Sequence, residues 1–536
     1  MSDDVILSGP ALRNAPRPLD ETIRTFDVRD RGISFLGAGG RERVGYADLA
    51  ARSAVVAKRL HRHGVDEGDM VAVSLSNDLG SVLVLLGIWT AGATAVSLPP
   101  RTAKGSDWYV RRFSPVLRTM GCEFVVVDEV AGADPAAFPE LRSMSRASLV
   151  AEGDDPRGPA DWRAPDTALI QFTSGSVGLP KGVAISAFAL AAHLESMAQA
   201  VELDGDRDRV VSWLPLYHDM GLVAMFMAGL SRRAEQVLAP PATFALQPGS
   251  WLAMLAAERA TITAAPSFAY RLAAGVAYES PLDLSSVRLS INGGERIDWQ
   301  TLLDFHAVAG PMGFRWEAIA PAYGLAEGTV AVTLNALGRG PVQGPDGHVA
   351  LGRPLPGVEV QTTGESSGPV WIRGMSAFSG YHTENGFVAK EDEEWFDTGD
   401  DGFTADGELF VVGRRAEVLS VGGRNIFAED IESVTREAAR GLVHVCAAFR
   451  NAAQDQRFGL IIETDPSSPE GQASPAELAK HVRATVTRTL GTRLTPILVV
   501  SPGTIPRTTS GKVQRSRCRT AIGDGKFGAR VLAELT

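Results

Sequence analysis

The stretch Gln171–Ser186, QFTSGSVGLPKGVAIS, constrains the fold more than any other part of the sequence. Apolar runs at 167–172 and 183–185 flank it and predict two strands joined by a loop. The loop's small and hydroxylated residues can direct several backbone N–H groups and hydroxyls at one anion: Thr173, Ser174, Gly175, Ser176 and Gly178. Lys181 adds positive charge beside them. The pattern indicates either a phosphate-binding loop or a surface Gly/Ser turn.

This loop is not a Walker A motif. That motif places glycine directly before its lysine, and Pro180 stands before Lys181 here. The remainder of the chain therefore has to decide between the two interpretations.

The whole-chain properties predict a cytoplasmic protein of several folding units. Its 536 residues are too many for one core. A net charge of -11 argues against nucleic acid as the main partner. The three cysteines, Cys122, Cys446 and Cys518, are far apart and indicate neither disulfides nor a thiolate metal site. The acidic N-terminus lacks the basic start of a signal peptide.

One uncharged stretch, residues 81–98, approaches the length of a membrane span. Gly92 divides it into an expected helix at 80–91 and an expected strand at 93–98. That division is typical of a buried α/β layer, so we expect no integral membrane segment.

The fold class predicted is α/β. Strands and helices alternate through the first 330 residues, which predicts largely parallel, mixed sheets covered by helices. From Pro341 many glycines and short apolar alternations predict a β-rich subdomain. Mixed elements return after Gly413, so we predict a large N-terminal domain at 1–413 and a small α+β domain at 414–536. We interpret residues 130–165 as a surface connection.

Three further junctions of a strand with a polar or glycine-rich loop accompany the phosphate loop. They are LPLYHDMGL, which holds His218 and Asp219, GGE at 293–295, and YGLAEGT at 323–329. Ligands collect beyond the carboxyl ends of strands in open α/β sheets, so these loops can share one crevice. Glu327 is a plausible Mg²⁺ ligand there. No GxSxG serine or HExxH motif accompanies His218, which argues against a hydrolase triad and a zinc site.

Four stretches together resemble the adenylate-forming superfamily of acyl-CoA synthetases, peptide-synthetase adenylation domains and luciferases. They are TSGSVGLPKG, YGLAEGT, WFDTGD with the following GR, and PRTTSGK. Within the superfamily, SWLPLYHDMGL, Pro99-Pro100 and GGRNIFAEDIE look most like fatty acyl-AMP ligases. The resemblance implies ATP- and Mg²⁺-dependent formation of acyl-AMP from a hydrophobic carboxylic acid, with release of pyrophosphate. Transfer to an acyl carrier protein or another thiol then follows, commonly in secondary metabolism, and the C-terminal domain is mobile.

The resemblance also implies roles for individual residues. Lys512 is the principal catalytic candidate, because an ammonium between the carboxylate and the α-phosphate stabilises developing charge. The phosphate loop and Lys181 would hold phosphates, and Glu327 would ligate Mg²⁺. Asp400 and Arg414 suit the ribose or phosphate. The expected adenine site consists of Gly293, Gly294, Glu295 and Tyr323, and Gly324 is a further expected nucleotide-binding residue.

The acyl part is expected near a set of apolar and aromatic side chains, with His218 orienting the acid at the pocket mouth. The set is Trp213, Met220, Phe268 and Tyr270, for each of which plain core packing is the alternative. His218 could instead only cap a helix.

The chain departs from the family pattern twice. The insertion that usually follows YGLAE and blocks CoA is absent. The hinge position, usually Asp or Lys, holds Ala416, which gives up polar contacts in either domain arrangement. From Ala416 we expect thioester formation to be weak here or delegated to another protein, whereas the missing insertion favours a CoA ligase.

Three alternatives stay open. One is a CoA ligase that completes both half-reactions. Another is an adenylating ligase for a bulky terpenoid or aromatic acid. The third is a nucleotide-binding homologue without catalysis, which joint retention of Glu327, Asp400, Arg414 and Lys512 argues against. The acceptor, CoA or a phosphopantetheinyl carrier, is not decided by the sequence.

Overall fold

The structure is a computed structural model of the chain. It describes residues 4–24, 30–99, 106–127, 138, 140–152, 165–173, 179–278, 281–363, 367–391, 394–421, 424–439, 442–443, 445–451, 457–465, 474–507 and 513–536. The expected phosphate-binding residues Ser174, Gly175, Ser176 and Gly178 lie outside this part of the chain, as does Lys512.

An eight-stranded sheet carries the two strands that were predicted around the phosphate loop. Its order is β20 (Gly386–Ala389), β19 (Gly380–Thr383), β9 (Lys181–Ser186), β8 (Thr167–Thr173), β5 (Thr94–Leu98), β4 (Met70–Ser74), β6 (Phe124–Val127) and β7 (Arg142–Ser145). Strands β8, β5, β4, β6 and β7 run parallel, and β9, β19 and β20 pair antiparallel at the other end. The prediction of a strand–loop–strand unit at 167–185 is therefore confirmed.

A nine-stranded sheet carries the other strand-to-loop junctions. Its order is β16 (Arg353–Pro354), β15 (Ala331–Leu334), β14 (Ile319–Gly324), β13 (Leu289–Asn292), β12 (Ile262–Ala265), β10 (Arg209–Ser212), β11 (Glu235–Leu238), β2 (Gly32–Gly37) and β3 (Gly40–Gly45). From β14 to β2 the neighbours are parallel, so β13 and β14 end at the same edge. This brings the GGE and YGLAEGT loops side by side.

A third sheet is entirely antiparallel and accounts for most of the predicted β-rich region. Its order is β1 (Val5–Ser8), β17 (Val358–Thr362), β18 (Gly368–Gly374), β21 (Phe396–Ala405) and β22 (Glu408–Arg414). Strand β1 lies in the N-terminal arm, where the sequence offers a strand pattern of only four residues. Its pairing with β17 fixes the N-terminal arm at the edge of this sheet.

Helices cover the two large sheets. Helix α6 packs on β8 and β9 and also on η2, which contacts β10, so it lies between the sheets. Before the C-terminal lobe the helices are α1 (Leu19–Arg24), α2 (Tyr46–Arg62), α3 (Leu79–Thr90), α4 (Ser106–Thr119), α5 (Arg146–Val150), α6 (Ala187–Ala200), η2 (Met220–Met227), α7 (Ala228–Ser231), α8 (Pro241–Leu246), α9 (Ser250–Ala257), α10 (Ser267–Ala274) and α11 (Trp299–Ala309). Short 3₁₀ turns include η5 (Ala326–Gly328) and η7 (Arg415–Glu417).

Helix α3 explains the uncharged stretch of the sequence. The Asp78 carboxylate caps it by accepting a hydrogen bond from the Ser81 N–H at 2.8 Å. Every residue of α3 except Gly80 is buried, which is why no polar face was needed. Gly92 then turns the chain at φ +75 into β5. No helix of the described residues combines the length and the apolar character needed to cross a membrane.

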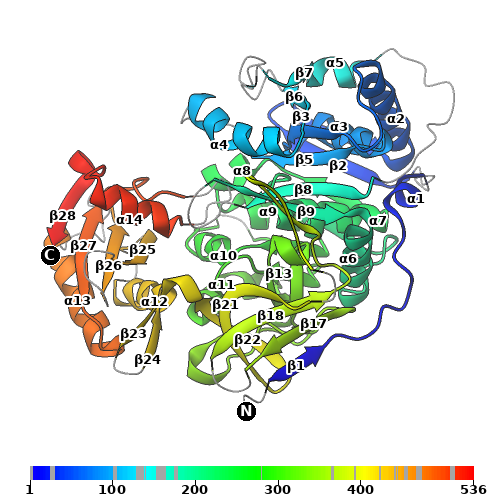
Figure 1. The fold of residues 1–536 in the computed structure, drawn as a ribbon. Coiled ribbons are helices and arrows are strands. Elements are labelled where there is room, and N and C mark those ends of the chain that lie inside the picture. Colours follow the sequence, from blue (N-terminus) through cyan, green and yellow to red (C-terminus); the bar gives the residue numbers. More distant parts are fainter. Residues whose placement is uncertain are drawn as a thin grey trace.

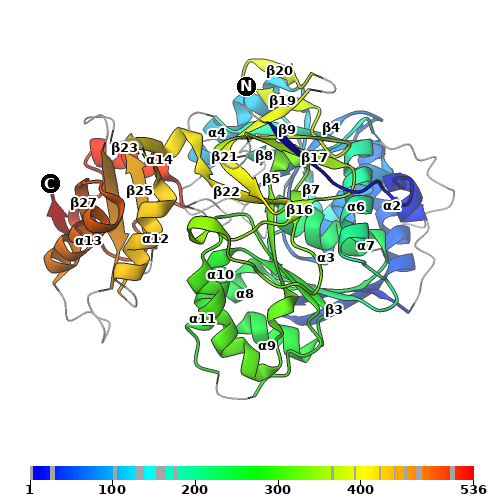
Figure 2. The ribbon, with the colours of Figure 1, turned by 90° about the horizontal axis from the view of Figure 1, so that it is seen from below.

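The last part of the chain forms a separate lobe beside the rest (Figures 1 and 2). It holds β23 (Val418–Val421), β24 (Arg424–Phe427), α12 (Ala428–Ala438), β25 (Val445–Arg450), β26 (Phe458–Glu463), α13 (Pro475–Leu490), β27 (Leu494–Val500), α14 (Arg515–Gly523) and β28 (Val531–Leu535). Its main core is built within residues 419–499. Ser474 and Glu477 form a capping box at α13, a local signal that the sequence carried.

The expectation of a surface connection at 130–165 is wrong for part of that segment. Residues 142–145 form β7, which extends the eight-stranded sheet, and 146–150 form α5. Met144 and Leu149 are buried. Because β7 is an edge strand with one buried side chain, its sequence RSMS has no apolar run from which a strand could be predicted.

Candidate active site

The predicted junctions surround one cavity of about 1220 Å³. The ends of β8, β13 and β14, the start of β9, and residues of the C-terminal lobe line it. Thr173, Lys181, His218, Glu295, Glu327, Asp400, Arg414 and Ala416 all belong to the lining. The sequence expectation that several loops share one crevice is thus met by the structure.

The two ends of the phosphate loop lie opposite each other in the sheet. Thr173, the last residue of β8, pairs with Lys181, the first of β9. The Lys181 ammonium lies 4.9 Å from the centre of the Tyr381 ring. Such a cation–π contact orients the ammonium while leaving its N–H donors for a ligand.

Glu327 lies in the turn η5, directly after β14. Its Oε1 accepts a hydrogen bond of 2.6 Å from the Tyr381 hydroxyl. Its backbone carbonyl accepts one from the Phe378 N–H at 2.9 Å. Tyr381 thus contacts both the carboxylate of Glu327 and the ammonium of Lys181.

The donor set fits Mg²⁺ held jointly with phosphates. Among the described residues there is no group of three or more His, Cys, Asp and Glu that could hold a metal ion alone. Mg²⁺ in nucleotide sites is commonly bound through one or two carboxylates and the phosphates of the substrate. Glu327 is in place to supply one such oxygen.

Asp400 is held by two donors. The Tyr323 hydroxyl donates to Oδ2 at 2.6 Å, and the Arg414 Nε lies 2.8 Å from Oδ1. Asp400 is 5% exposed, and burial raises its pKa, while Arg414 and the Tyr323 hydroxyl act in the opposite direction. Burial and the adjacent carboxylate also raise the pKa of Tyr323 well above its ordinary value, so the phenol stays a donor. Arg414 lies opposite Asp400 in the β21–β22 pairing, so the two strands hold these residues side by side.

The GGE and YGL loops are close-fitting. Gly294 has φ +81, a conformation that glycine adopts without strain. A Cβ atom on Gly324 would lie 1.7 Å from the Val330 carbonyl oxygen, so glycine alone fits there. Gly293 also lines the cavity. The Glu295 carboxylate accepts a hydrogen bond from the Phe268 N–H at 2.5 Å, which fixes the start of α10 beside the loop.

His218 lies at the cavity wall before the π-helix η2. Its Nδ1 is 2.5 Å from Asp219 Oδ1, which also accepts from the Met220 N–H at 2.7 Å. Asp219 is therefore the residue that caps η2, and His218 is oriented by it. Met220 and Phe268 line the same cavity.

Two residues expected in the acyl pocket do not line this cavity in the described structure. Tyr270 is fully buried, packs against Trp251 and Phe305, and donates to the Ser290 carbonyl oxygen at 3.2 Å. Trp213 stacks on Phe244 at 4.0 Å. Tyr270 is therefore a core-packing residue, which was the alternative considered for both. Trp213 supports the cavity wall through its edge contact with Phe268.

Sequence reasoning missed Tyr381 and Gln171. Tyr381 lies on β19, which the chain reaches about 200 residues after β9, so no local pattern predicts its position. Gln171 lines the cavity, and both of its side-chain amide atoms are buried without a hydrogen-bond partner among the described residues. A lone glutamine in the apolar run ALIQF was the available signal. Such an orphaned amide fits a polar ligand.

The predicted hinge Ala416 lies in η7 between two anchored neighbours. Arg415 pairs with Asp397 at 2.8 Å and with Asp401 at 2.9 Å, both on β21. Glu417 pairs with Arg515 of the C-terminal lobe at 2.6 Å. Each side of position 416 is thereby tied to a different lobe.

The loop predicted to carry the catalytic lysine has both of its described ends at the cavity. Arg507 and Val513 form an isolated antiparallel bridge, and both line the cavity. Arg507 is held by Glu463 at 3.1 Å. Lys512 itself lies outside the described residues, so its role stays a prediction.

Comparisons with known proteins agree with this geometry. The family model described as AMP-binding enzyme matches residues 21–382. The chain is 30% identical to the 4-hydroxyphenylalkanoate adenylyltransferase of Mycobacterium tuberculosis, covering 89% of this chain and 86% of that protein. It is also 30% identical to the long-chain-fatty-acid–AMP ligase FadD28 of Mycobacterium bovis, covering 88% and 91%.

Solved structures give the same result. One from work on fatty acyl-adenylate ligases of E. coli and L. pneumophila has a TM-score of 0.84 at 27% identity, covering 96% of this chain and 99% of that one. The McyG A-PCP structure, at 22% identity and a TM-score of 0.85, shares the fold. The predicted α/β fold class is confirmed. The predictions of family and enzyme class are confirmed as well: the chain belongs to the AMP-binding enzyme family and is an acyl-adenylate-forming ligase.

Proposed function

We propose that this protein activates a hydrophobic carboxylic acid with MgATP and that the residues around the large cavity carry the reaction. The observation that carries the proposal is the meeting of the phosphate-loop ends, Glu327 and the Asp400–Tyr323–Arg414 group at one cavity. These are the groups needed for phosphates, a metal ion and a ribose. The products are acyl-AMP and pyrophosphate.

No general base is required for the first step. A carboxylic acid is ionised near neutral pH and is already a nucleophile. The protein instead has to position this anion against a polyanion and offset their repulsion. Lys181 contributes a fixed ammonium beside the phosphate loop, and we assign Lys512 to the carboxylate and α-phosphate. Glu327 would hold a Mg²⁺ ion that accompanies the nucleotide, and this ion would supply further charge neutralisation.

Asp400 is proposed to bind the ribose hydroxyls. Its two oxygens are oriented by Tyr323 and Arg414, so the acceptor geometry exists before nucleotide binds. Tyr323 also offers its ring, and Gly293, Gly294 and Gly324 offer backbone close to it, which suits an adenine base.

The acyl chain is proposed to lie against the apolar part of the lining. That wall consists of Met197, Met220, Ala224, Phe268, Ile291 and Ala331. It comes from α6, η2, α10, β13 and β15, and His218 lies on the same side at Asp219. A fatty acid or a related hydrophobic acid suits these side chains.

The acceptor is proposed to be the thiol of a phosphopantetheinyl carrier or of CoA. Arg112 and Arg517 line the same cavity and suit a phosphate of either acceptor.

Both neighbours of Ala416 are anchored, each to a different lobe. This supports the proposal that the C-terminal lobe turns at Ala416. If its missing polar side chain weakens thioester formation, Ala416→Lys will raise the rate of thioester formation and leave acyl-AMP formation unchanged. An unchanged thioester rate would contradict this part.

Pyrophosphate release over a panel of carboxylic acids tests the proposal. Three arms are run: no acceptor, CoA, and a phosphopantetheinyl carrier protein. We expect acid-dependent release that stalls near one equivalent without the correct acceptor, and loss of release in Lys512→Ala. Acid-independent release, or full activity of Lys512→Ala, would refute the assignment.

A further inference from the structure

Helix α12 lies on the side of the C-terminal lobe that faces the first lobe, the part of the chain before Arg415 (Figures 1 and 2). Asp430, in the first turn of α12, pairs with Arg296 of the first lobe, whose Nη1 lies 2.7 Å from Asp430 Oδ1. One turn later the Ser433 hydroxyl donates to Asp298 Oδ2 at 3.3 Å. Arg296 and Asp298 follow the GGE loop directly and line the active-site cavity. Helix α12 is therefore attached to a wall of the active site.

The two carboxylates of this attachment are fixed within their own lobes. Asp430 Oδ2 accepts a hydrogen bond from the Phe427 N–H at 2.9 Å at the start of α12. Asp298 caps α11, because its Oδ1 accepts from the Thr301 N–H at 2.8 Å. Carboxylates that are already ordered lose little conformational freedom when they bind a partner in the other lobe.

The same helix is bonded to the loop predicted to carry the catalytic lysine. Glu429 and Glu432 of α12 pair with Arg515 at 2.8 and 2.7 Å. Arg515 comes two residues after Val513, which forms the bridge with Arg507 at the described ends of that loop. A contiguous set of ion pairs thus runs from the wall beside the GGE loop, through α12, to the loop of residues 507–513.

Two arginines oppose the attachment across the same interface. Arg271 of α10 and Arg436 of α12 both line the cavity. Burial lowers the pKa of Arg271, and the nearby Arg436 acts in the same direction, while Glu295 and Asp298 offset part of the effect. Like charges repel each other, so the pair formed by Arg296 works against a repulsion, and its loss should loosen the interface.

We propose that Arg296 is a positioning residue for acyl-AMP formation. Through Asp430 it holds α12, and through α12 it holds the loop of residues 507–513 at the cavity. The inference rests on the proposed function, in which Lys512 of this loop assists attack at the α-phosphate. Transfer of the acyl group from a finished acyl-AMP does not include that attack, so it should depend less on Arg296.

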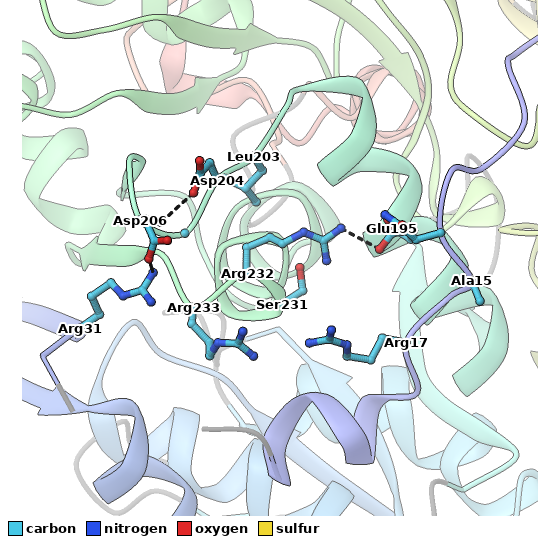
Figure 3. A pocket seen from close by; sticks show the side chains of 12 residues that line it. Ala15, Arg17, Arg31, Glu195, Leu203, Asp204, Asp206, Ser231, Arg232 and Arg233 are labelled. Carbon is cyan, nitrogen blue, oxygen red and sulfur yellow. Dashed lines mark hydrogen bonds and ion pairs between the residues drawn. The ribbon is translucent and has the colours of Figure 1, made fainter. Parts of the chain in front are cut away.

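An ion pair within the first lobe supplies a matched control. Arg232 lies 2.7 Å from Glu195, and its side chain is 25% exposed, against 26% for Arg296. The pair borders a cavity of about 610 Å³ that shares no lining residue with the active-site cavity (Figure 3). Because Glu195 is buried, Arg232→Gln should cost more stability than Arg296→Gln. The control therefore separates an effect on stability from an effect on positioning.

The experiment measures acyl-AMP formation, acyl transfer and ATP binding separately on the full chain. Formation is followed as acid-dependent pyrophosphate release, and ATP affinity by calorimetry. Transfer is measured from a supplied acyl-AMP to CoA in one arm and to a phosphopantetheinyl carrier protein in the other.

We expect Arg296→Gln and Asp430→Asn each to lower the rate of acyl-AMP formation by about three- to tenfold, and the double variant to lower it no further. Transfer and ATP affinity should stay within about twofold of the natural protein, because the residues proposed to bind ATP in the first lobe are unchanged. Arg296→Lys keeps the charge and should recover most of the rate. Arg232→Gln should leave all three quantities unchanged.

Three results would overturn the proposal. Additive losses in the double variant would mean that Arg296 and Asp430 act separately. An equal loss of formation in Arg232→Gln would mean that reduced stability is the cause. Equal losses of formation and ATP affinity in Arg296→Gln would indicate a distorted cavity.

The same assay separates this inference from the proposed function. Equal pyrophosphate release in the natural protein and in Arg296→Gln would refute the inference alone. No acid-dependent release in the natural protein would refute the proposed function, and the inference with it.

Discussion

Two carboxylates at the active site, Asp400 and Glu327, have the same partner type but different surroundings. Each accepts a 2.6 Å hydrogen bond from a tyrosine hydroxyl. Asp400 is buried and also pairs with Arg414 at 2.8 Å. Glu327 is partly exposed, and the described residues give its carboxylate no ion pair. The Lys181 ammonium contacts the ring of Tyr381 instead.

The difference separates two functions of one chemical group. The charge of Asp400 is balanced within the protein, so its oxygens are fixed acceptors that suit hydroxyl groups. The charge of Glu327 is not balanced in this way, so it keeps an attraction for a cation.

Glu327→Gln keeps the shape of the side chain and an acceptor for Tyr381 but removes the charge. If Glu327 binds Mg²⁺, acid-dependent pyrophosphate release should fall by on the order of 10²-fold or more. The Tm should hardly change, since no ion pair is lost. Exposed Glu384, changed to Gln, serves as the control. Activity within about threefold of the natural protein would remove Glu327 from the cation site.

Asp400→Asn should lower the stability of the folded protein, which Glu327→Gln should hardly change. Removing the buried charge leaves Arg414 without its partner, and we expect a loss of about 1–3 kcal/mol in the free energy of unfolding, reduced because Arg414 is half-exposed. The KM for ATP should rise. Urea unfolding and steady-state kinetics measure both quantities. We expect Glu327→Gln to leave the unfolding midpoint unchanged. If Asp400→Asn also leaves it unchanged, the proposed difference between the two carboxylates is wrong.

The two tyrosines sharpen the comparison further. Tyr323→Phe removes a hydrogen bond to a buried carboxylate and should cost about 1–2 kcal/mol of stability. Tyr381→Phe removes one to a partly exposed carboxylate and should cost less than about 1 kcal/mol. Tyr381→Phe should nonetheless raise the Mg²⁺ concentration needed for half-maximal activity, because Tyr381 orients Glu327. Equal stability losses in the two variants would contradict the account.

A third buried carboxylate, Glu429, extends the comparison to the C-terminal lobe. Arg515 forms ion pairs with three carboxylates. They are Glu429 at 2.8 Å, Glu432 at 2.7 Å and Glu417 at 2.6 Å. Burial raises the pKa of Glu429 to about 7 despite Arg515. The folded protein therefore holds a proton that the unfolded chain has lost, and this contribution to stability fades as the pH rises through about 7.

Glu429→Gln should therefore gain stability relative to the natural protein as the pH rises from 5 to 8. The expected change is small, on the order of 1 °C in Tm per pH unit, because Arg515 offsets part of the charge. Thermal unfolding of both proteins across this range measures the difference. A difference that stays constant across this range would show that Glu429 is ionised throughout and would contradict the raised pKa.

Local patterns were sufficient for much of the fold. The apolar runs around the phosphate loop predicted β8 and β9, and Gly92 marked the end of α3. Each of these depends on residues close together in the sequence. The edge strand β7 was missed because three of its four side chains are not buried.

The site was predictable only in part, for the same reason. Thr173, Glu327 and Asp400 stood in recognisable stretches, but their tyrosine partners were not linked to them by any short-range signal. Tyr381 reaches Glu327 only because β19 pairs with β9. Tyr270 was misplaced because a core aromatic and a pocket aromatic have the same sequence pattern.

The central claim is that the acid attacks the α-phosphate of ATP, and an oxygen-isotope measurement tests it directly. A carboxylic acid labelled with ¹⁸O in both oxygens is incubated with the protein, MgATP and the acceptor, and the nucleotide product is analysed by mass spectrometry. Attack at the α-phosphorus leaves one labelled oxygen on AMP after thioester formation, which is the predicted result. Unlabelled AMP, or ADP with labelled inorganic phosphate, would contradict formation of an acyl-AMP.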